Sequence, residues 1–391
     1  MRKEPVLRLK RGRERARWHP WIFKGDVADV SDVEPGAVVT VLAAGGHFLA
    51  RGLYNPGPAL CCRILTWRDE PVDAAFYRRR LEAALARRTR DGATPELGRL
   101  VWSEADGLPG LVVDRYGPVL VIQCLTLGMA RRRRELVTAL HALVGDLPVF
   151  SADEATPAVL EGFPAERGWV DHEGPGRVVV EEGPVKLGVS FGLGHKTGLY
   201  LDQGDNRRRL GALAGGVDVL DAFSYTGAFA CHALAAGARR AVCLESSPEA
   251  IAAARENFAL NGVGARAEIV AGNAFDELRR LEREHARFGL VVLDPPPFAR
   301  SRQAMDAAVR GYKEVNLRAM RLLAPGGRLA TFSCSHHVPE ALFEEICREA
   351  AADCRVTLRV VTRLTQSSDH PVLLTVPETR YLKGLLLELV G

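Results

Sequence analysis

The chain has 391 residues, more than the roughly 250–300 at which a single core stops growing, so two or three domains are expected. Hydrophobic residues make up 47% and charged residues 26%, which is typical of globular proteins and excludes a disordered or fibrous chain. The longest apolar runs are far shorter than the about 20 residues of a membrane span, and the N-terminus lacks the apolar stretch of a secretory signal, so we expect a cytoplasmic protein without a membrane partner.

The net charge of +4 is distributed unevenly. Residues 1–24 hold nine Lys or Arg against two Glu, and Trp18, Trp21 and Phe23 stand among them. Cations contact phosphates and aromatic rings stack on bases, so this segment predicts an RNA-binding module, although a solvated basic arm has the same charge. The candidate RNA-binding residues are Arg11, Arg13, Arg17, Trp21 and Lys24.

Eight cysteines are scattered along the sequence without a C-x-x-C pair. This spacing supports neither a zinc ribbon nor a thioredoxin-like redox site. Histidine-rich ligand patterns are also missing, so no metal is predicted. Most of the cysteines stand in apolar surroundings and are expected to be reduced core residues.

The first 70 residues predict a small β-barrel. Turn signals such as Pro-Gly, Gly-Gly and Asn-Pro-Gly separate short apolar segments, which we expect to be strands at 27–33, 37–42, 48–54 and 59–65. Between residues 71 and 185 the pattern indicates a compact α+β domain. Its expected helices are 72–90 and 130–143, and its expected strands are 100–104, 111–116, 119–124 and 176–181.

From residue 186 to the end, strands alternate with helices, which is typical of a doubly wound parallel sheet. The tail, residues 355–363 and 372–390, is expected to add further β segments. The candidate parallel strands are 217–222, 241–245, 267–270, 290–293 and 328–333.

The first of these strands runs into the turn Asp221-Ala222-Phe223-Ser224-Tyr225-Thr226-Gly227, with a helix from about residue 228. Doubly wound folds bind a cofactor at the turn after the first strand. The turn holds one glycine rather than G-x-G-x-x-G, so a pyrophosphate cradle is poorly supported.

Two further polar residues follow the next strands. Glu245 ends the second strand, where a carboxylate can bind ribose hydroxyls, and Asn273 follows the third, placed to meet an adenine amino group. Each feature alone could be an ordinary helix N-cap, but the ordered series favours S-adenosylmethionine over NAD. The candidate cofactor-binding residues are Asp221, Phe223, Ser224, Tyr225, Thr226, Gly227, Glu245 and Asn273.

The fourth strand is followed by Asp294-Pro295-Pro296-Pro297-Phe298. Proline neither continues a helix nor donates to a sheet, so this segment predicts a rigid loop. In nucleic-acid methyltransferases an Asp-Pro-Pro segment holds the target base. A simple strand terminator would not need the aspartate.

The fifth strand ends in Ser333-Cys334-Ser335-His336-His337. Strands four and five are neighbours in this fold, so Cys334 is expected to face Asp294 across one cleft. A thiolate that adds to carbon 6 of a pyrimidine makes carbon 5 nucleophilic, which is covalent catalysis by cysteine. A core thiol is the alternative, and it fits a polar strand end less well.

Six motifs occur in order: GHKTGLYLDQ from Gly194, DAFSYTGAF from Asp221, DPPPF from Asp294, GYKEVNLRAM from Gly311, TFSCSHH from Thr331 and DHPVLLTVPETRYLKGL from Asp369. Together they resemble one family over essentially the whole chain, the bacterial ribosomal RNA large subunit methyltransferase I family of 23S rRNA cytosine-C5 methyltransferases. The segment RWHPWIF from Arg17 looks like the PUA domain of that family.

The resemblance implies an α/β fold: a Rossmann-like class I methyltransferase domain over 186–391, an N-terminal PUA-like β-barrel over 1–70 and a small α+β middle domain over 71–185. It implies that Cys334 is the nucleophile and that Asp294 holds the base. It adds to the S-adenosylmethionine contacts Lys196, Thr197, Tyr200, Gln203 and Asp294.

The resemblance also implies partners: 23S rRNA or a precursor of the large ribosomal subunit, and, since members of the family are often dimers, a second copy of the chain. Many RNA cytosine-C5 methyltransferases carry a second cysteine beside the aspartate loop. Here Pro295-Pro296-Pro297 stands there, so the group that removes the carbon-5 proton stays unassigned among His336, His337 and water.

Three alternatives remain open. An rRNA guanine or adenine N-methyltransferase on the same fold would not need the thiol of Cys334. A non-catalytic RNA-binding assembly factor would need neither Cys334 nor Asp294. A nicotinamide oxidoreductase is disfavoured by the missing glycine fingerprint.

Overall fold

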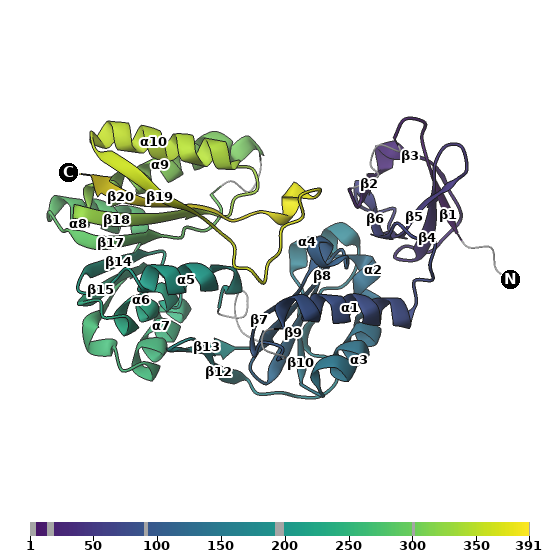
Figure 1. Cartoon of the computed structure of the whole chain (residues 1–391), viewed down its shortest axis with the longest axis horizontal. Helices are drawn as coiled ribbons and strands as arrows, with labels where there is room; N and C mark the ends of the chain where they lie inside the picture. The colour runs from purple at the N-terminus through teal and green to yellow at the C-terminus, as the bar shows by residue number, and fades with distance from the viewer. Residues whose placement is uncertain (1–4, 14–18, 90–92, 192–198, 299–301, 391) are drawn as a thin grey trace. The chain divides into compact units, whose positions relative to one another are not determined.

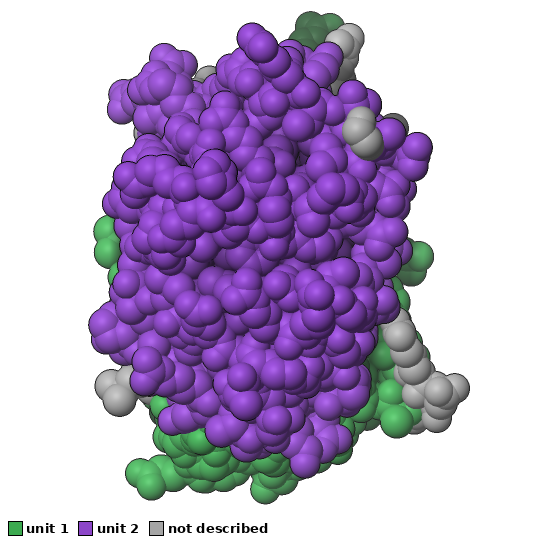
Figure 2. Space-filling model, turned by 90° about the vertical axis from the view of Figure 1, so that its left-hand side faces the viewer, with its two compact units in different colours: residues 1–178, 191–196, 369–379 green, residues 179–190, 197–368, 380–391 purple. Residues whose placement is uncertain are grey.

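The computed structural model describes residues 5–13, 19–89, 93–191, 199–298 and 302–390. The chain forms two compact units, coloured green and purple in Figure 2. The first unit contains residues 1–178, 191–196 and 369–379, and the second contains residues 179–190, 197–368 and 380–391. Figure 1 labels the helices and strands of both. No helix among the described residues is long and apolar enough to span a membrane.

The first unit begins with a six-stranded sheet. Apolar residues of alternating strand positions, among them Leu7, Val39 and Val41, point into one core and are almost fully buried. The strand order is β2-β6-β5-β4-β1-β3. The strands are β1 (Val6–Leu9), β2 (Trp21–Phe23), β3 (Val27–Val30), β4 (Val38–Leu42), β5 (Phe48–Tyr54) and β6 (Leu60–Thr66).

The four strands expected in this segment are present, and β1 and β2 were not anticipated. β1 lies within the basic N-terminal segment, where arginine and lysine mask its apolar alternation, and β2 is only three residues long.

A second sheet of the first unit has the order β11-β10-β9-β8-β7. Its β8 (Leu111–Tyr116) and β9 (Val119–Cys124) coincide with the expected strands. The expected strand 100–104 is shifted, because Ser103–Asp106 forms a 3-10 turn after β7 (Leu97–Trp102). The remaining elements are α1 (Ala74–Arg88), α2 (Leu127–Ala130), α3 (Arg133–Val144), β10 (Val149–Ala152), α4 (Ala155–Glu161) and β11 (Arg167–Trp169).

The second unit is built on a seven-stranded sheet in the order β16-β15-β14-β17-β18-β20-β19. All neighbouring strands are parallel except at β20, which is antiparallel to both of its neighbours. This confirms the expected doubly wound sheet. The strands are β14 (Asp218–Ala222), β15 (Arg240–Glu245), β16 (Ala267–Ala271), β17 (Phe288–Leu293), β18 (Leu323–Ser333), β19 (Thr357–Thr365) and β20 (Lys383–Val390).

Helices cover both faces of this sheet (Figure 1). One core cluster packs α8, α9 and α10 on one face through residues such as Leu278, Tyr312 and Phe343. The helices are α5 (Gly204–Gly211), α6 (Ala228–Ala235), α7 (Pro248–Leu260), α8 (Ala274–Arg283), α9 (Met305–Arg321) and α10 (Glu340–Cys354). A hairpin of β12 (Arg177–Glu182) and β13 (Val185–Ser190) precedes them.

The expectation of β structure throughout residues 372–390 is wrong for the first part of that segment. Only β20 is a strand; before it, an isolated bridge joins Leu373 to Val376 and a 3-10 turn covers Pro377–Thr379. Pro377 has no amide hydrogen to donate to a sheet, and the Thr379 hydroxyl accepts the amide of Leu373, which closes the turn.

A buried ionic cluster joins the β12–β13 hairpin to the helices of the second unit. Glu182 accepts two hydrogen bonds from the Arg207 guanidinium, at 2.7 and 2.6 Å, and the His232 ring nitrogen lies 2.8 Å from the same carboxylate. All three side chains are at most 4% exposed. Burial alone would raise the pKa of Glu182, but Arg207 and His232 outweigh it and hold that pKa well below its usual range.

Replacing this carboxylate should destabilise the second unit. Glu182→Ala leaves a buried guanidinium without its partner, and we expect a loss of about 3–5 kcal/mol in urea unfolding at neutral pH. The pKa of Glu182 is lower in the folded than in the unfolded chain, so the deficit should shrink as the pH falls below the unfolded value of about 4.3. Glu284→Ala, which removes an exposed pair with Arg280, is the control at about 0.5 kcal/mol or less. Equal losses in the two variants would contradict the assignment.

Candidate active site

The carboxyl ends of the parallel strands of the second unit meet at one edge of the sheet. The strand order reverses at β14, between β15 and β17, and such a reversal opens a crevice where ligands bind. Register pairs Glu245 with Ala271 and Leu293 with Thr331, so the ends of neighbouring strands are level. The structure thereby brings together the predicted residues that end these strands or follow them: Asp221, Glu245, Asn273, Asp294 and Cys334.

The turn between β14 and α6 is tightly wound. Phe223, Tyr225 and Gly227 have φ angles of 63°, 50° and 71°, in the left-handed region. For the first two residues this conformation costs roughly 1 kcal/mol or more each, as is common at functional sites. At Gly227 a Cβ atom would lie 2.8 Å from the ring of Phe258, so both the φ angle and the space require glycine.

Glu245 organises this turn. One of its carboxylate oxygens accepts the amide of Tyr225 at 2.8 Å, and the other accepts the amides of Ser246 and Ser247 at 2.7 and 2.8 Å. Ser224 is also tied to β15, because its amide donates to the Leu244 carbonyl at 3.1 Å. The acid predicted to bind a ribose therefore also fixes the loop that precedes α6.

The remaining polar members of the series have local partners. The side chain of Asn273 accepts the amide of Phe275 at 2.9 Å and caps α8, which leaves its amide nitrogen for another acceptor. Thr226 is buried, and its carbonyl accepts the side-chain amide of Asn257. The N-cap alternative thus holds in part for Asn273.

Asp221 is fully buried near the carboxyl end of β14. One oxygen accepts the amide of Ala230 at 3.1 Å, while Oδ1 has no hydrogen-bond partner among the described residues. Burial raises the pKa of this carboxyl to about 8, and the nearby acids Asp294 and Glu245 add to the shift. A buried carboxylate oxygen without a donor is costly, and a cationic ligand would satisfy it.

Two residues of the predicted cofactor set precede α5. Gln203 is buried, and its Nε2 has no hydrogen-bond partner within the described ranges. Tyr200 is 38% exposed, and its ring packs edge-on against that of Tyr225 at 5.2 Å. Lys196 and Thr197 lie outside the described residues. An unsatisfied buried carboxylate oxygen and an unsatisfied buried amide nitrogen fit a ligand such as S-adenosylmethionine, which carries cationic and carboxylate groups.

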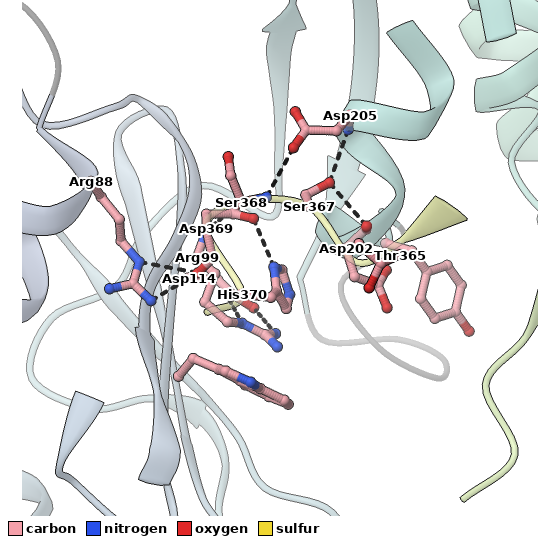
Figure 3. A network of polar contacts seen from close by, with 12 residues as sticks. Arg88, Arg99, Asp114, Asp202, Asp205, Thr365, Ser367, Ser368, Asp369 and His370 are labelled. Carbon is pink, nitrogen blue, oxygen red and sulfur yellow. Dashed lines mark hydrogen bonds and ion pairs between the residues drawn. The ribbon is translucent and has the colours of Figure 1, made fainter. Parts of the chain in front are cut away.

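The segment before α5 is held from a distant part of the chain (Figure 3). The amide and hydroxyl of Ser367, after β19, both donate to the Asp202 carbonyl, at 2.7 and 2.9 Å. The amide of Asp205 donates to the Ser367 hydroxyl, and the amide of Ser368 donates to the Asp205 carboxylate, each at 2.9 Å. These bonds fix the turn that carries Gln203.

Residues 369–379, which follow Ser368 in the connection between β19 and β20, belong to the first unit. Arg88 donates two hydrogen bonds to the Asp369 carbonyl, and the Arg99 amide donates to the Asp369 carboxylate at 2.8 Å (Figure 3). His370 lies 2.7 Å from the same carboxylate. The DHP segment of the sequence is therefore anchored within the first unit.

Asp294 and Cys334 follow adjacent strands, as expected from the fold. The loop after Asp294 presents the carbonyl of Pro295, and the Cys334 thiol lies 3.9 Å from that oxygen. Asp294 and Cys334 are both half-buried, whereas Pro296 and Pro297 are exposed. A thiol beside an acidic, proline-bound loop can reach a ligand held by that loop.

Side chains that the sequence analysis did not single out support the Cys334 turn. The Ser333 hydroxyl donates to the Tyr312 hydroxyl at 3.0 Å, which is also 2.9 Å from the Ser335 hydroxyl. The Lys383 ammonium donates to the Ser335 carbonyl at 2.7 Å. Tyr312 and Lys383 fall within the GYKEVNLRAM and DHPVLLTVPETRYLKGL motifs, which were the one signal for them.

The candidate RNA-binding residues lie in the first unit. Arg11, Arg13 and Lys24 are exposed, and Arg17 lies outside the described residues. Trp21 is half-buried; its indole nitrogen donates to Glu104 at 2.8 Å, and its ring packs against His19. Phe23, which was not among the candidates, is 46% exposed.

Comparison with known proteins places this geometry in a family. The family model for S-adenosylmethionine-dependent methyltransferases matches residues 164–387, and that for a PUA-like domain matches residues 7–67. The chain is 36% identical to ribosomal RNA large subunit methyltransferase I of Alteromonas mediterranea, over 99% of each chain. It is 39% identical to the protein of the same name from Shewanella frigidimarina, over 97% of this chain and 98% of that one.

Solved structures support the fold. A candidate S-adenosylmethionine-dependent methyltransferase from Streptococcus mutans is similar with a TM-score of 0.84 at 18% identity, over 98% of this chain and 99% of that one. A candidate methyltransferase solved in complex with SAH has a TM-score of 0.85 at the same identity and coverage. The chain therefore belongs to the ribosomal RNA large subunit methyltransferase I family, with a PUA-like domain before an S-adenosylmethionine-dependent methyltransferase fold.

Proposed function

We propose that the protein forms 5-methylcytosine in 23S rRNA through a covalent bond between Cys334 and carbon 6 of the cytosine. The substrate class follows from the relatives, which are named as ribosomal RNA large subunit methyltransferases. The observation that carries the carbon-5 chemistry is the position of the Cys334 thiol, 3.9 Å from the Pro295 carbonyl in the loop that Asp294 begins.

The proposed reaction uses this thiol because carbon 5 of cytosine is a weak nucleophile. Asp294 holds the N3/N4 edge of the base, and the Cys334 thiolate adds to carbon 6. The Sγ–C6 bond forms as the C5–C6 double bond opens, which makes carbon 5 an enamine carbon able to accept a methyl group. His336, His337 or water then takes the carbon-5 proton, and the electron pair of the broken C5–H bond restores the double bond as Sγ leaves as a thiolate.

The cofactor, when bound, supplies an activated methyl group. We propose that Tyr200 and Gln203 on one side, and Asp221, the 223–227 turn, Glu245 and Asn273 on the other, hold it. The unpartnered oxygen of Asp221 and the unpartnered amide nitrogen of Gln203 support this assignment. Lys196 and Thr197 stay in the proposed set on the resemblance alone.

We further propose that RNA contacts the exposed cations of the N-terminal domain. Lys10, Arg13 and Lys24 surround the turn at Gly25 and Asp26: Lys10 and Lys24 donate to the carbonyls of Gly25 and Gly57, and Arg13 pairs with Asp26. Phe23 adds an exposed ring beside them. Cations with an exposed ring fit single-stranded RNA, since phosphates meet the charge and a base can stack on the ring.

The reaction class can be tested by trapping. Fluorine at carbon 5 cannot be eliminated as a proton is, so an rRNA fragment containing 5-fluorocytosine should become covalently attached to Cys334 in the presence of S-adenosylmethionine. Mass spectrometry of the digested complex locates the attached residue. Cys334→Ala should form no adduct and should lose methylation of ordinary RNA.

Cys354→Ala is the matched control for that experiment. Its thiol is also half-buried, but Cys354 is the last residue of α10 and its thiol donates to the Leu317 carbonyl of α9. This variant should keep its activity. A Cys334→Ala protein that still methylates RNA would favour the N-methyltransferase alternative, and a chain that binds no S-adenosylmethionine would favour the assembly factor.

Removing the Glu245 carboxylate should weaken cofactor binding. Hydrogen bonds to a charged group contribute about 1.5–3 kcal/mol, so Glu245→Ala should raise the Kd for S-adenosylmethionine by about 10- to 100-fold in calorimetry. Glu249→Ala, whose carboxylate accepts the Ser247 hydroxyl two residues along the same loop, should bind normally. An unchanged Kd in Glu245→Ala would remove this residue from the proposed site.

Removing cations from the N-terminal domain should weaken RNA binding and its salt dependence. For Arg11→Ala/Lys24→Ala we expect the slope of log K against log salt to fall in magnitude by up to about two, measured with a 23S rRNA fragment. Arg348→Ala/Arg359→Ala carries the same change in net charge on the second unit, at side chains 70% and 64% exposed. Identical slopes in the two double variants would argue against an N-terminal RNA surface.

A further inference from the structure

Lys383 is a buried cation beside the turn that carries the reactive thiol. It is the first residue of β20, pairs in register with Ser333 of β18, and is 7% exposed. Its ammonium donates to the Ser335 carbonyl at 2.7 Å, one residue beyond Cys334. Lys383 is therefore bound on both sides of Cys334 in the sequence: its backbone pairs with Ser333, and its ammonium binds the carbonyl of Ser335.

This ammonium has an unusual electrostatic environment. Glu340 and Arg380 are the other charged side chains that act on it, and these two pair with each other at 2.8 Å. Within the described part of the chain, no carboxylate lies at ion-pair distance from the Lys383 nitrogen. Burial lowers the pKa of Lys383, and the Cys334 thiol opposes that shift. A buried ammonium without a carboxylate is costly unless another anion balances it.

Within the described ranges, the acid and the two phenols near Cys334 do not favour its ionisation. Asp294, from the end of β17, carries the same sign of charge as a thiolate, and the phenols of Tyr200 and Tyr312 are neutral at ordinary pH. The adjacent His336 and His337 are exposed to solvent. Among the described residues, the ammonium of Lys383 is the buried cation that lies beside this turn, and a positive charge there stabilises a thiolate.

We propose that Lys383 is a positioning residue that stabilises the thiolate of Cys334 and holds its turn through the Ser335 carbonyl. The inference rests on the proposed role of Cys334 as nucleophile. It can be tested independently of that role, because the pKa of the Cys334 thiol can be measured without RNA or cofactor.

The test is the pH dependence of Cys334 alkylation in the full-length protein. Iodoacetamide labelling of Cys334, followed by peptide mass spectrometry, reports the thiolate fraction at each pH. In Lys383→Met the labelling midpoint should rise by about one pH unit, with labelling at pH 7 about tenfold slower. Lys383→Arg keeps the positive charge and should stay near the unmodified midpoint.

Tyr312→Phe separates charge from geometry. It removes the hydroxyl that binds Ser333 and Ser335 without changing any charge at neutral pH, so its midpoint should stay within a few tenths of a pH unit. An equal rise in Tyr312→Phe and Lys383→Met would overturn the inference, because the turn rather than the charge would then control the thiol. An unchanged midpoint in Lys383→Met would overturn it as well.

These outcomes are distinct from failure of the proposed function. Loss of RNA methylation in Lys383→Met with an unchanged alkylation midpoint would overturn the thiolate role and leave Cys334 as nucleophile. Full methylation in Cys334→Ala would show that Cys334 is not the nucleophile. That conclusion would hold whatever alkylation midpoint Cys334 has in the unmodified protein.

Discussion

The parallel sheet of the second unit is the constraint on which the site depends. Since β14 to β18 run in the same direction, every side chain at a strand's carboxyl end reaches one edge. The antiparallel strand β20 also places a side chain at this edge, but from its other end. β20 enters the sheet at that edge, so it contributes its first residue, Lys383, where the parallel strands contribute their last.

The same edge gathers negative charge, which has to be stabilised. Glu245 is satisfied by three backbone amides, and Asp221 by one, so the two acids differ in what they leave for a ligand. The raised pKa of Asp221, about 8, is the consequence of burying a carboxyl that lacks a donor on one oxygen. A cationic cofactor would supply the missing favourable interaction and pull that pKa down.

Much of this arrangement could be predicted from the sequence, because a strand ends where an apolar run is followed by polar or turn-forming residues. The order of the first parallel strands follows from one rule of handedness and placement, which brings Asp221, Glu245 and Asp294 together. Lys383 could not be placed in this way. Its relation to Cys334 requires β20 to be inserted between β18 and β19, and nothing in the local pattern reveals that insertion. The strand expected before Lys383 failed for a local reason, the turn that Pro377 and Thr379 impose.

Its surroundings distinguish Cys334, the proposed nucleophile, from the other seven cysteines. Burial raises the pKa of each of the other seven thiols, to about 12 at Cys124, Cys231 and Cys347. A thiol held that far above neutral pH is a packing group, since the thiolate is the nucleophile. Cys334 stands instead at a half-buried strand end, between two serines bound to one phenol and beside a lysine that has no acidic partner in the described structure. The position of β20 is what makes that environment, so the strand that breaks the parallel pattern of the sheet is also the one that would tune its chemistry.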